Sequence, residues 1–219
     1  MEGGFPIENG ELGVVALRIG PAEVVMARLV KAIDIVPADL EASHSKPGCL
    51  HELARLFGAL GNNMERKRFL TRVLKLNRDR GDERGVALTS RMLSDTNRSL
   101  GLYGEGMKQA REASKIRERL GDIVGQAWCF SDLASLLYDD GQLDAAEEAA
   151  FHSIALLSGK GEESLLCQLH DHLGNIYRSK GKRKKATHHL EVALGIATLF
   201  NWRSELFWVE LSLGKVVSG

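Results

Sequence analysis

The sequence has little of what breaks helices or cross-links small secreted domains. Its four prolines end at Pro47, so residues 48–219 contain none. Because a proline inside a helix removes a backbone hydrogen bond, this absence permits long helices over most of the chain. The three cysteines form no CxxC pair and cannot all pair with one another. This pattern favours a reducing compartment over a disulfide-stabilised secreted protein.

An excess of one charge and long apolar runs are also missing. Lys plus Arg and Asp plus Glu number 29 each, which argues against a nucleic-acid-binding protein that relies on bulk positive charge. No segment approaches the roughly 20 apolar residues that span a membrane. The N-terminus carries Glu2 and Glu8 but no basic region of a signal peptide. We therefore expect a cytoplasmic protein that binds neither nucleic acid nor membrane.

Motifs of catalysis and metal binding are absent too. The sequence has no GxxxxGK[ST] phosphate loop, no GxSxG and no HExxH. Four histidines occur close together, but ligands on one helix share a face only at i, i+3 or i, i+4 spacing. His170 and His172 are two apart, and His188 and His189 are adjacent. We therefore predict no enzyme, no cofactor and no metal site.

What the sequence does contain is a repeat of 40 residues. Leucines recur at positions 53, 93, 133 and 173, and glycines at 61, 101, 141 and 181. A second column, 20 residues out of phase, holds Gly81, Gly121, Gly161 and Asn201. Each half-unit has apolar residues at helical spacing and ends on a Gly or Asn, the residues that adopt the left-handed conformation at the end of a helix. Each unit is therefore predicted to be a helix hairpin that buries its apolar faces by stacking on its neighbours.

The phase of the repeat predicts an all-α fold, a right-handed α-solenoid of about four to five hairpins. Helices are expected near 48–60, 63–79, 84–100, 103–119, 124–140, 143–158, 163–180, 183–200 and 203–217. The repeats would span 46–83, 84–123, 124–163 and 164–203, with an incomplete unit at 204–219. Residues 1–45 are interpreted as a degenerate earlier repeat and linker, with the linker extending over 43–48.

One repeat carries the signature of a known family. The pattern L-G-x-x-Y…A…(F/L)…A of tetratricopeptide (TPR) repeats is matched by Leu173, Gly174, Tyr177, Ala186, Leu190 and Ala193. The 40-residue spacing and the joint at Leu120-Gly121-Asp122 resemble the longer variant of kinesin light chains and LGN-type polarity adaptors. The second repeat departs from the pattern at Ser94, Asn97 and Gly106, and the first at Arg66.

A closer resemblance covers residues 84–219. The segments LLYDDGQLDAAEEA, GNIYRSKGK and HHLEVALGIATLFNW resemble C-terminal repeat arrays of fungal signalling ATPases with an NB-ARC-type nucleotide-binding domain. This resemblance implies a sensor or scaffold arm beside an ATPase. A free-standing adaptor of the cargo or polarity type is the alternative, and an enzyme on a helical scaffold is a third, less favoured hypothesis.

The family resemblance also implies a partner-binding groove lined by the first helix of each hairpin. The corresponding residues are Leu88, Arg91, Asp95 and Arg98, then Trp128, Ser131, Ser135 and Tyr138, then Gln168, Asp171, Asn175 and Arg178. They describe a groove of mixed charge with two aromatic residues, suited to a protein or peptide partner. The alternative is an ordinary solvated helix face. The Lys/Asn/Arg set with which chaperone-binding members hold a C-terminal carboxylate is not reproduced.

Two features remain, one formed by charged residues and one by apolar residues. A basic run at Lys180 and 182–185 lies 40 residues after an acidic run at 139–148. Because residues 40 apart are neighbours in a stack, we expect the two runs to pair rather than to bind an anionic partner.

Phe207, Trp208 and Leu211 surround much of the last helix. We expect this helix to be exposed in a fragment of a longer array and to mediate self-association.

Overall fold

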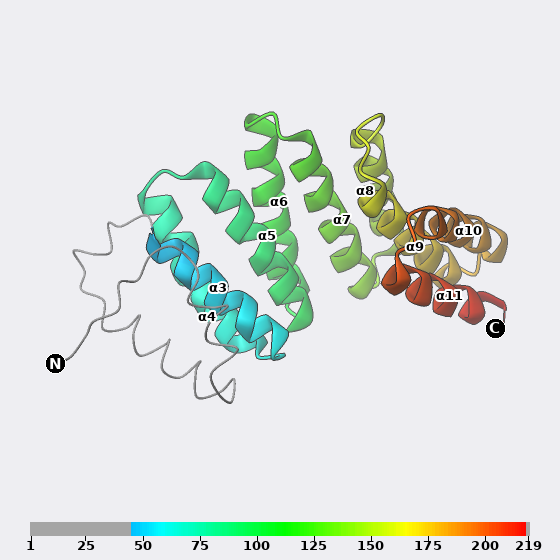
Figure 1. Cartoon of the computed structure of the whole chain (residues 1–219), viewed down its shortest axis with the longest axis horizontal. Coiled ribbons are helices and arrows are strands. Elements are labelled where there is room, and N and C mark those ends of the chain that lie inside the picture. The colour runs from blue at the N-terminus through cyan, green and yellow to red at the C-terminus, as the bar shows by residue number, and fades with distance from the viewer. Residues whose placement is uncertain (1–44, 218–219) are drawn as a thin grey trace. The chain divides into compact units, whose positions relative to one another are not determined.

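The computed structural model describes residues 45–217, and every regular element in that range is an α-helix (Figure 1). The helices are α3 (Ser45–Ala59), α4 (Asn63–Asp79), α5 (Glu83–Ser99), α6 (Tyr103–Arg119), α7 (Ile123–Asp139), α8 (Leu143–Leu156), α9 (Glu163–Ser179), α10 (Arg183–Leu199) and α11 (Arg203–Val217). Consecutive helices pack as hairpins, as α3 does with α4, α7 with α8 and α9 with α10. This arrangement confirms the predicted helical-repeat solenoid.

The turns between helices repeat one backbone geometry. Gly81 has φ +68°, and Asn201 adopts the same left-handed region with φ +54°. Beyond Gly81, the amide of Asp82 donates to the carbonyl of Asn77 at 2.9 Å, and Gly81 itself donates to Arg78 at 3.0 Å. These bonds satisfy carbonyls that the end of α4 leaves without helical partners. The Gly/Asn column of the sequence is thus explained by the backbone that it permits.

The helix boundaries agree with the predicted ranges to within a residue or two, except at α3. This helix begins at Ser45, whereas residues up to 48 were predicted to form a linker. Pro47 lies in its first turn, where the missing N–H has no helical acceptor to lose. Helix α8 ends at Leu156, two residues early, before Gly159 and Gly161, which both have positive φ. Residues 1–44 of the predicted N-terminal repeat lie outside the described residues.

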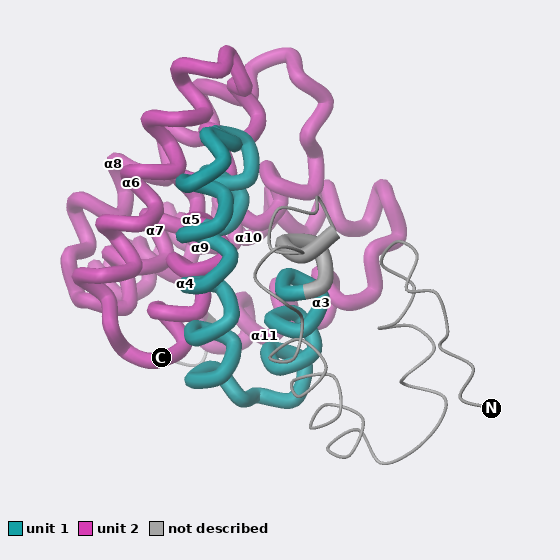
Figure 2. Tube along the Cα trace, turned by 90° about the vertical axis from the view of Figure 1, so that its left-hand side faces the viewer, with its two compact units in different colours: residues 1–89 teal, residues 90–219 magenta. Residues whose placement is uncertain are grey.

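The chain divides into two compact units, and the boundary between them in the sequence falls within α5 (Figure 2). The described part of the first unit, residues 45–89, contains α3, α4 and the start of α5. Its core includes Phe57 and Phe69, whose rings stack at 5.3 Å. The buried Asn77 donates to Thr89 Oγ1 at 3.1 Å, which satisfies a polar group that would otherwise be costly to bury.

The second unit, residues 90–219, holds a continuous core that runs along α6 to α11. Small residues let its helices approach closely. A Cβ atom on Gly106 would lie 2.7 Å from Leu136 Cδ2, and one on Gly174 would lie 2.5 Å from Leu190 Cγ. Gly106, which departs from the TPR pattern, therefore leaves the space that the Leu136 side chain occupies. The core of this unit fixes the helices that carry the predicted groove residues.

Candidate functional site

Eleven of the twelve residues predicted to line the groove belong to the second unit and come from three helices, whereas Leu88 belongs to the first unit. The 40-residue period places them at equivalent positions of α5, α7 and α9. Asp95, Arg98 and Gln168 are exposed, while Ser131 and Ser135 are buried. The others are half-buried: Arg91, Trp128, Tyr138, Asp171, Asn175 and Arg178. The set therefore combines an exposed rim with side chains that take part in packing.

Arg91 on α5 connects two of these helices. Its Nε donates to Oδ2 of Asp132 on α7 at 2.7 Å, and its guanidinium carbon lies 4.7 Å from the ring centroid of Trp128. Burial raises the pKa of Asp132 to about 6, although the charge and hydrogen bond of Arg91 oppose this rise. Arg91 thus holds Trp128 and Asp132 in place and is committed to contacts within the protein.

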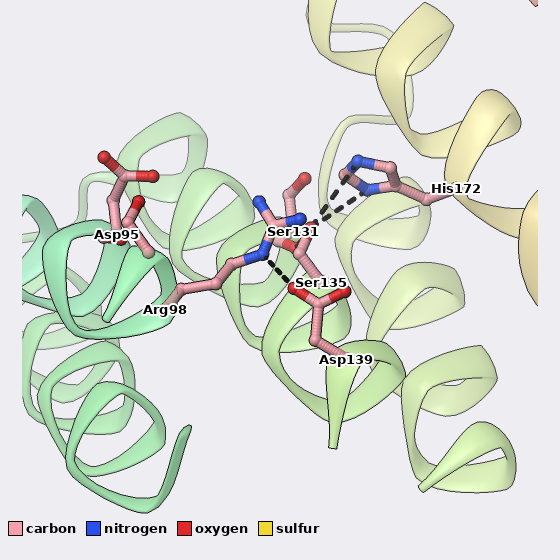
Figure 3. A network of polar contacts seen from close by, with 7 residues as sticks. Asp95, Arg98, Ser131, Ser135, Asp139 and His172 are labelled. Carbon is pink, nitrogen blue, oxygen red and sulfur yellow. Dashed lines mark hydrogen bonds and ion pairs between the residues drawn. The ribbon is translucent and has the colours of Figure 1, made fainter. Parts of the chain in front are cut away.

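A second set of contacts lies one to two turns further along the same helices (Figure 3). Arg98 Nε donates to Asp139 Oδ2 at 2.6 Å, and Ser135 Oγ lies 3.4 Å from His172 Nδ1 on α9. Burial, followed by the charge of Arg98, lowers the pKa of His172 to about 4. His172 is therefore neutral at pH 7 and able to accept or donate a hydrogen bond to Ser135.

The polar contacts continue toward the C-terminal end of the unit. Tyr138 Oη lies 3.1 Å from Ser179 Oγ on α9. Asn175 donates to the Asp171 backbone carbonyl at 3.0 Å and reaches Ser212 Oγ on α11 at 3.5 Å. Neighbouring first helices of the hairpins are thus joined by side chains along their length. We call this surface of α5, α7, α9 and α11 the polar face.

A small cavity opens on the polar face. It has a volume of about 20 Å³, close to that of one water molecule. Ser94, Asp95, Arg98, Asp132, Ser135 and Leu136 line it. The hydroxyl of Ser94 is buried and has no protein hydrogen-bond partner. The cavity can therefore accept a small polar group beside two carboxylates and a guanidinium.

Several residues of the polar face were not predicted from the sequence. Asp132, Asp139 and His172 were missed, although each bonds a predicted residue. The bonded pairs lie 41 or 37 residues apart, one position more or three fewer than the repeat. A search for complementary polar residues at these two separations would have found them. On α11, Trp208 and Leu211 occupy the columns of Gln168 and Asp171 and are 60% and 41% exposed.

The acidic and basic runs meet at Lys180, as the repeat predicts. Its Nζ lies 2.6 Å from Asp144 Oδ1 and also donates to Glu147, which accepts a second hydrogen bond from Tyr177 Oη at 2.6 Å. Burial raises the pKa of Glu147, but the hydrogen bonds from Lys180 and Tyr177 outweigh burial and hold it below its usual value. Lys185 Nζ lies 5.1 Å from the Tyr177 ring centroid, a cation–π contact.

The four clustered histidines separate into different environments. His172 faces Ser135, whereas His170 on α9 meets His189 on α10, with their Nδ1 atoms 3.0 Å apart. Spacing within one helix does not indicate this pairing, because the two histidines belong to different helices. Within residues 45–217, no group of three or more His, Cys, Asp or Glu side chains is arranged to hold a metal ion. In the same range, no helix is long and apolar enough to cross a membrane.

Comparison with known proteins gives matches at the level of structure. No protein-family model matches the sequence, and no curated protein sequence matches it either. A structure from Podospora anserina, described as nearly identical TPR-like repeats of a kinesin light chain, superposes with TM-score 0.67 at 18% identity. The match covers 90% of this chain and 100% of that chain.

Two further structures have the same arrangement of helices. One is a STAND signal-transduction ATPase of Pyrococcus horikoshii with a tetratricopeptide-repeat sensor, with TM-score 0.69, 14% identity and coverage of 93% of this chain and 33% of that one. The other is a Rap protein in complex with Competence and Sporulation Factor, with TM-score 0.73, 13% identity and coverage of 93% and 60%. At such identities the likeness concerns the fold. Together with the 40-residue repeat and the stacked hairpins, it identifies the fold of this chain as that of the TPR-like helical-repeat proteins.

Proposed function

We propose that the chain is a protein-interaction module whose polar face binds a protein or peptide partner. The observation that carries this proposal is the continuity of the face. The predicted residues Arg91, Arg98 and Ser135 each bond a residue of the next repeat. The three contacts that join neighbouring repeats in this way are Arg91–Asp132, Arg98–Asp139 and Ser135–His172. A continuous row of fixed donors and acceptors suits an extended partner better than a small molecule.

The face offers contacts of more than one kind. Asp95 and Gln168 are exposed and so can bind a partner directly. The cavity beside Ser94 accommodates one small polar group, such as a hydroxyl. At the other end, Trp208 and Leu211 add apolar surface, and large aromatic residues are enriched at the centres of interfaces. The partner therefore combines polar groups with at least one apolar side chain.

The larger context of this module is, in our proposal, a signalling ATPase in which the chain is the sensor or scaffold arm. The resemblance of residues 84–219 to fungal arrays of this kind supports that placement. The solved ATPase with a tetratricopeptide-repeat sensor supports it independently, because this chain matches about a third of its length. The free-standing adaptor is the second candidate, and the likeness to repeats described as those of a kinesin light chain favours it. We do not propose an enzymatic activity.

A site-specific crosslinking experiment tests the binding face. A photo-crosslinking amino acid replaces Gln168, on the polar face, or Glu148, which is exposed on α8. Both variants are expressed in the source organism, and crosslinked proteins are identified by mass spectrometry. We expect proteins that are crosslinked from position 168 and are not crosslinked from position 148.

Binding of the captured partner is then measured with point variants. Asp95→Lys and Gln168→Lys are expected to weaken binding at least tenfold, whereas Glu148→Lys leaves it unchanged. Circular dichroism confirms that all three variants stay folded. A partner that crosslinks from position 148 and is indifferent to both changes on α5 and α9 would place the binding surface on the second helices instead.

A further inference from the structure

Two histidines meet edge to edge between the helices of the fourth hairpin. His170 Nδ1 on α9 lies 3.0 Å from His189 Nδ1 on α10, and the ring centroids are 5.2 Å apart. These distances place both nitrogens close to the line between the ring centres. The two lone-pair directions therefore point at each other, which is the geometry of one N–H···N hydrogen bond rather than of two ligands directed at a common metal ion.

The gap between the two Nδ1 atoms has room for one hydrogen atom. A neutral imidazole carries one N–H, so one ring must be protonated at Nδ1 and the other at Nε2. A first additional proton can bind at an Nε2 atom and leaves the shared N–H in place. A second additional proton puts hydrogens on both Nδ1 atoms, which cannot remain 3.0 Å apart.

We propose that His170 and His189 form a one-proton clamp between α9 and α10, which opens when both rings become charged and so loosens this hairpin in acid. The clamp is a property of the fold and does not depend on the proposed binding of a partner. It lies beside the polar face, because Asp171 and His172 follow His170 directly on α9.

The surroundings of the clamp disfavour its charged state. Tyr177 stacks on His189 with centroids 5.3 Å apart, while Phe151 of α8 approaches its ring edge-on at 6.1 Å. The charges that act on His189 come from His170, His188 and Lys185, which are cationic or become so in acid, and from Glu147 of α8. Glu147 already accepts hydrogen bonds from Tyr177 and Lys180, so its carboxylate is paired with these two residues rather than with His189.

These surroundings set the pH range of the effect. Burial, and then the neighbouring histidines, lower the pKa of His189 to about 4, and burial also lowers the pKa of His170. An unfolded histidine titrates near pH 6.5. The unfolded chain therefore binds more protons between these values, so the stabilisation by neutral histidines is complete above about pH 6.5 and falls as the pH approaches 4.

The first test observes the shared hydrogen directly. The full chain is labelled with ¹⁵N-histidine, and long-range ¹H–¹⁵N correlation spectra at about pH 7.5 report the tautomer of each ring. His170→Gln and His189→Gln variants assign the two sets of signals. We expect one ring as the Nδ1–H tautomer, the other as Nε2–H, and a scalar coupling between the two Nδ1 nuclei. Two rings that are both Nε2–H tautomers would overturn the clamp.

The second test measures its consequence for stability. We compare the fall in melting temperature between about pH 7.5 and pH 5 for the wild type, His170→Gln and a control, His152→Gln. His152 is exposed and stacks on Phe130 at 4.1 Å, without a histidine partner. We expect a smaller fall for His170→Gln and the wild-type fall for the control. His172 is present in all three proteins and contributes equally to them, so equal falls for His170→Gln and the wild type would contradict the proposal.

Discussion

Gly174 on α9 and Leu190 on α10 pack so closely in the fourth hairpin that a Cβ atom on Gly174 would lie 2.5 Å from Leu190 Cγ. Leu190 is fully buried. Gly174 is the glycine of the L-G-x-x-Y pattern that the sequence matches. The packing gives it a physical cause.

Gly174→Ala is therefore expected to destabilise the protein by about 1–3 kcal/mol through overpacking. Gly195, in the middle of α10, is the matched control, since a Cβ atom there meets nothing within 4 Å. Gly195→Ala should stabilise the helix by about 0.5–1 kcal/mol. Urea unfolding measures both variants, and a Gly174→Ala variant that is stabilised as Gly195→Ala is would show that the close approach is not present.

The ion pair between Arg98 and Asp139 predicts a charge-swap result. Arg98→Asp places two carboxylates together and Asp139→Arg two guanidinium groups, so each single variant should lose stability. The pair is partly exposed, with 41% and 26% of the two side chains accessible, so each loss should be about 0.2–1 kcal/mol. The double variant should recover most of the loss. If urea unfolding shows instead that the two losses add in the double variant, Arg98 and Asp139 do not contact each other.

Tyr177 predicts a destabilisation that depends on pH. Its hydroxyl donates to Glu147 at 2.6 Å, so Tyr177→Phe should cost about 1.5 kcal/mol at neutral pH. Because the folded protein holds the pKa of Glu147 below its usual value, this stabilisation is present above the unfolded pKa and disappears as the pH falls through the folded one. The deficit should therefore shrink in acid. Tyr138→Phe, at the more exposed bond to Ser179, is the control and should cost little.

The aromatic surface of α11 predicts self-association. Phe207 and Trp208 are 59% and 60% exposed, and their rings contact each other at 5.2 Å. Exposed apolar surface of this kind promotes association. Sedimentation velocity of the 219-residue chain should show a mass that rises with concentration, and the Phe207→Lys, Trp208→Lys double variant should be monomeric. Leu199→Lys changes another exposed residue, 79% accessible, and should leave the association unchanged. A wild-type chain that stays monomeric at high concentration would contradict this prediction.

The sequence by itself determined the hairpins and their phase. Gly81 and Asn201 mark helix ends because the backbone conformation of a turn is a local property, and the residues that tolerate positive φ are few. Leu133 and Leu173 were placed in the core for a similar reason: helical periodicity specifies which face of each helix is apolar. The period of 40 also predicted that Lys180 would meet the acidic run of the preceding unit.

Only the tertiary structure decided which side chains meet across that period. Arg91 bonds Asp132 at a separation of 41, and Ser135 meets His172 at 37. Because stacked helices are offset, a side chain contacts a residue one or three positions away from its own equivalent in the next repeat. His170 and His189 come together because α9 and α10 pack closely along Gly174 and Leu190. A periodic pattern specifies the faces of helices, but the offset and the rotation between two packed helices follow from the fit of their side chains, and these set the partners of each polar residue.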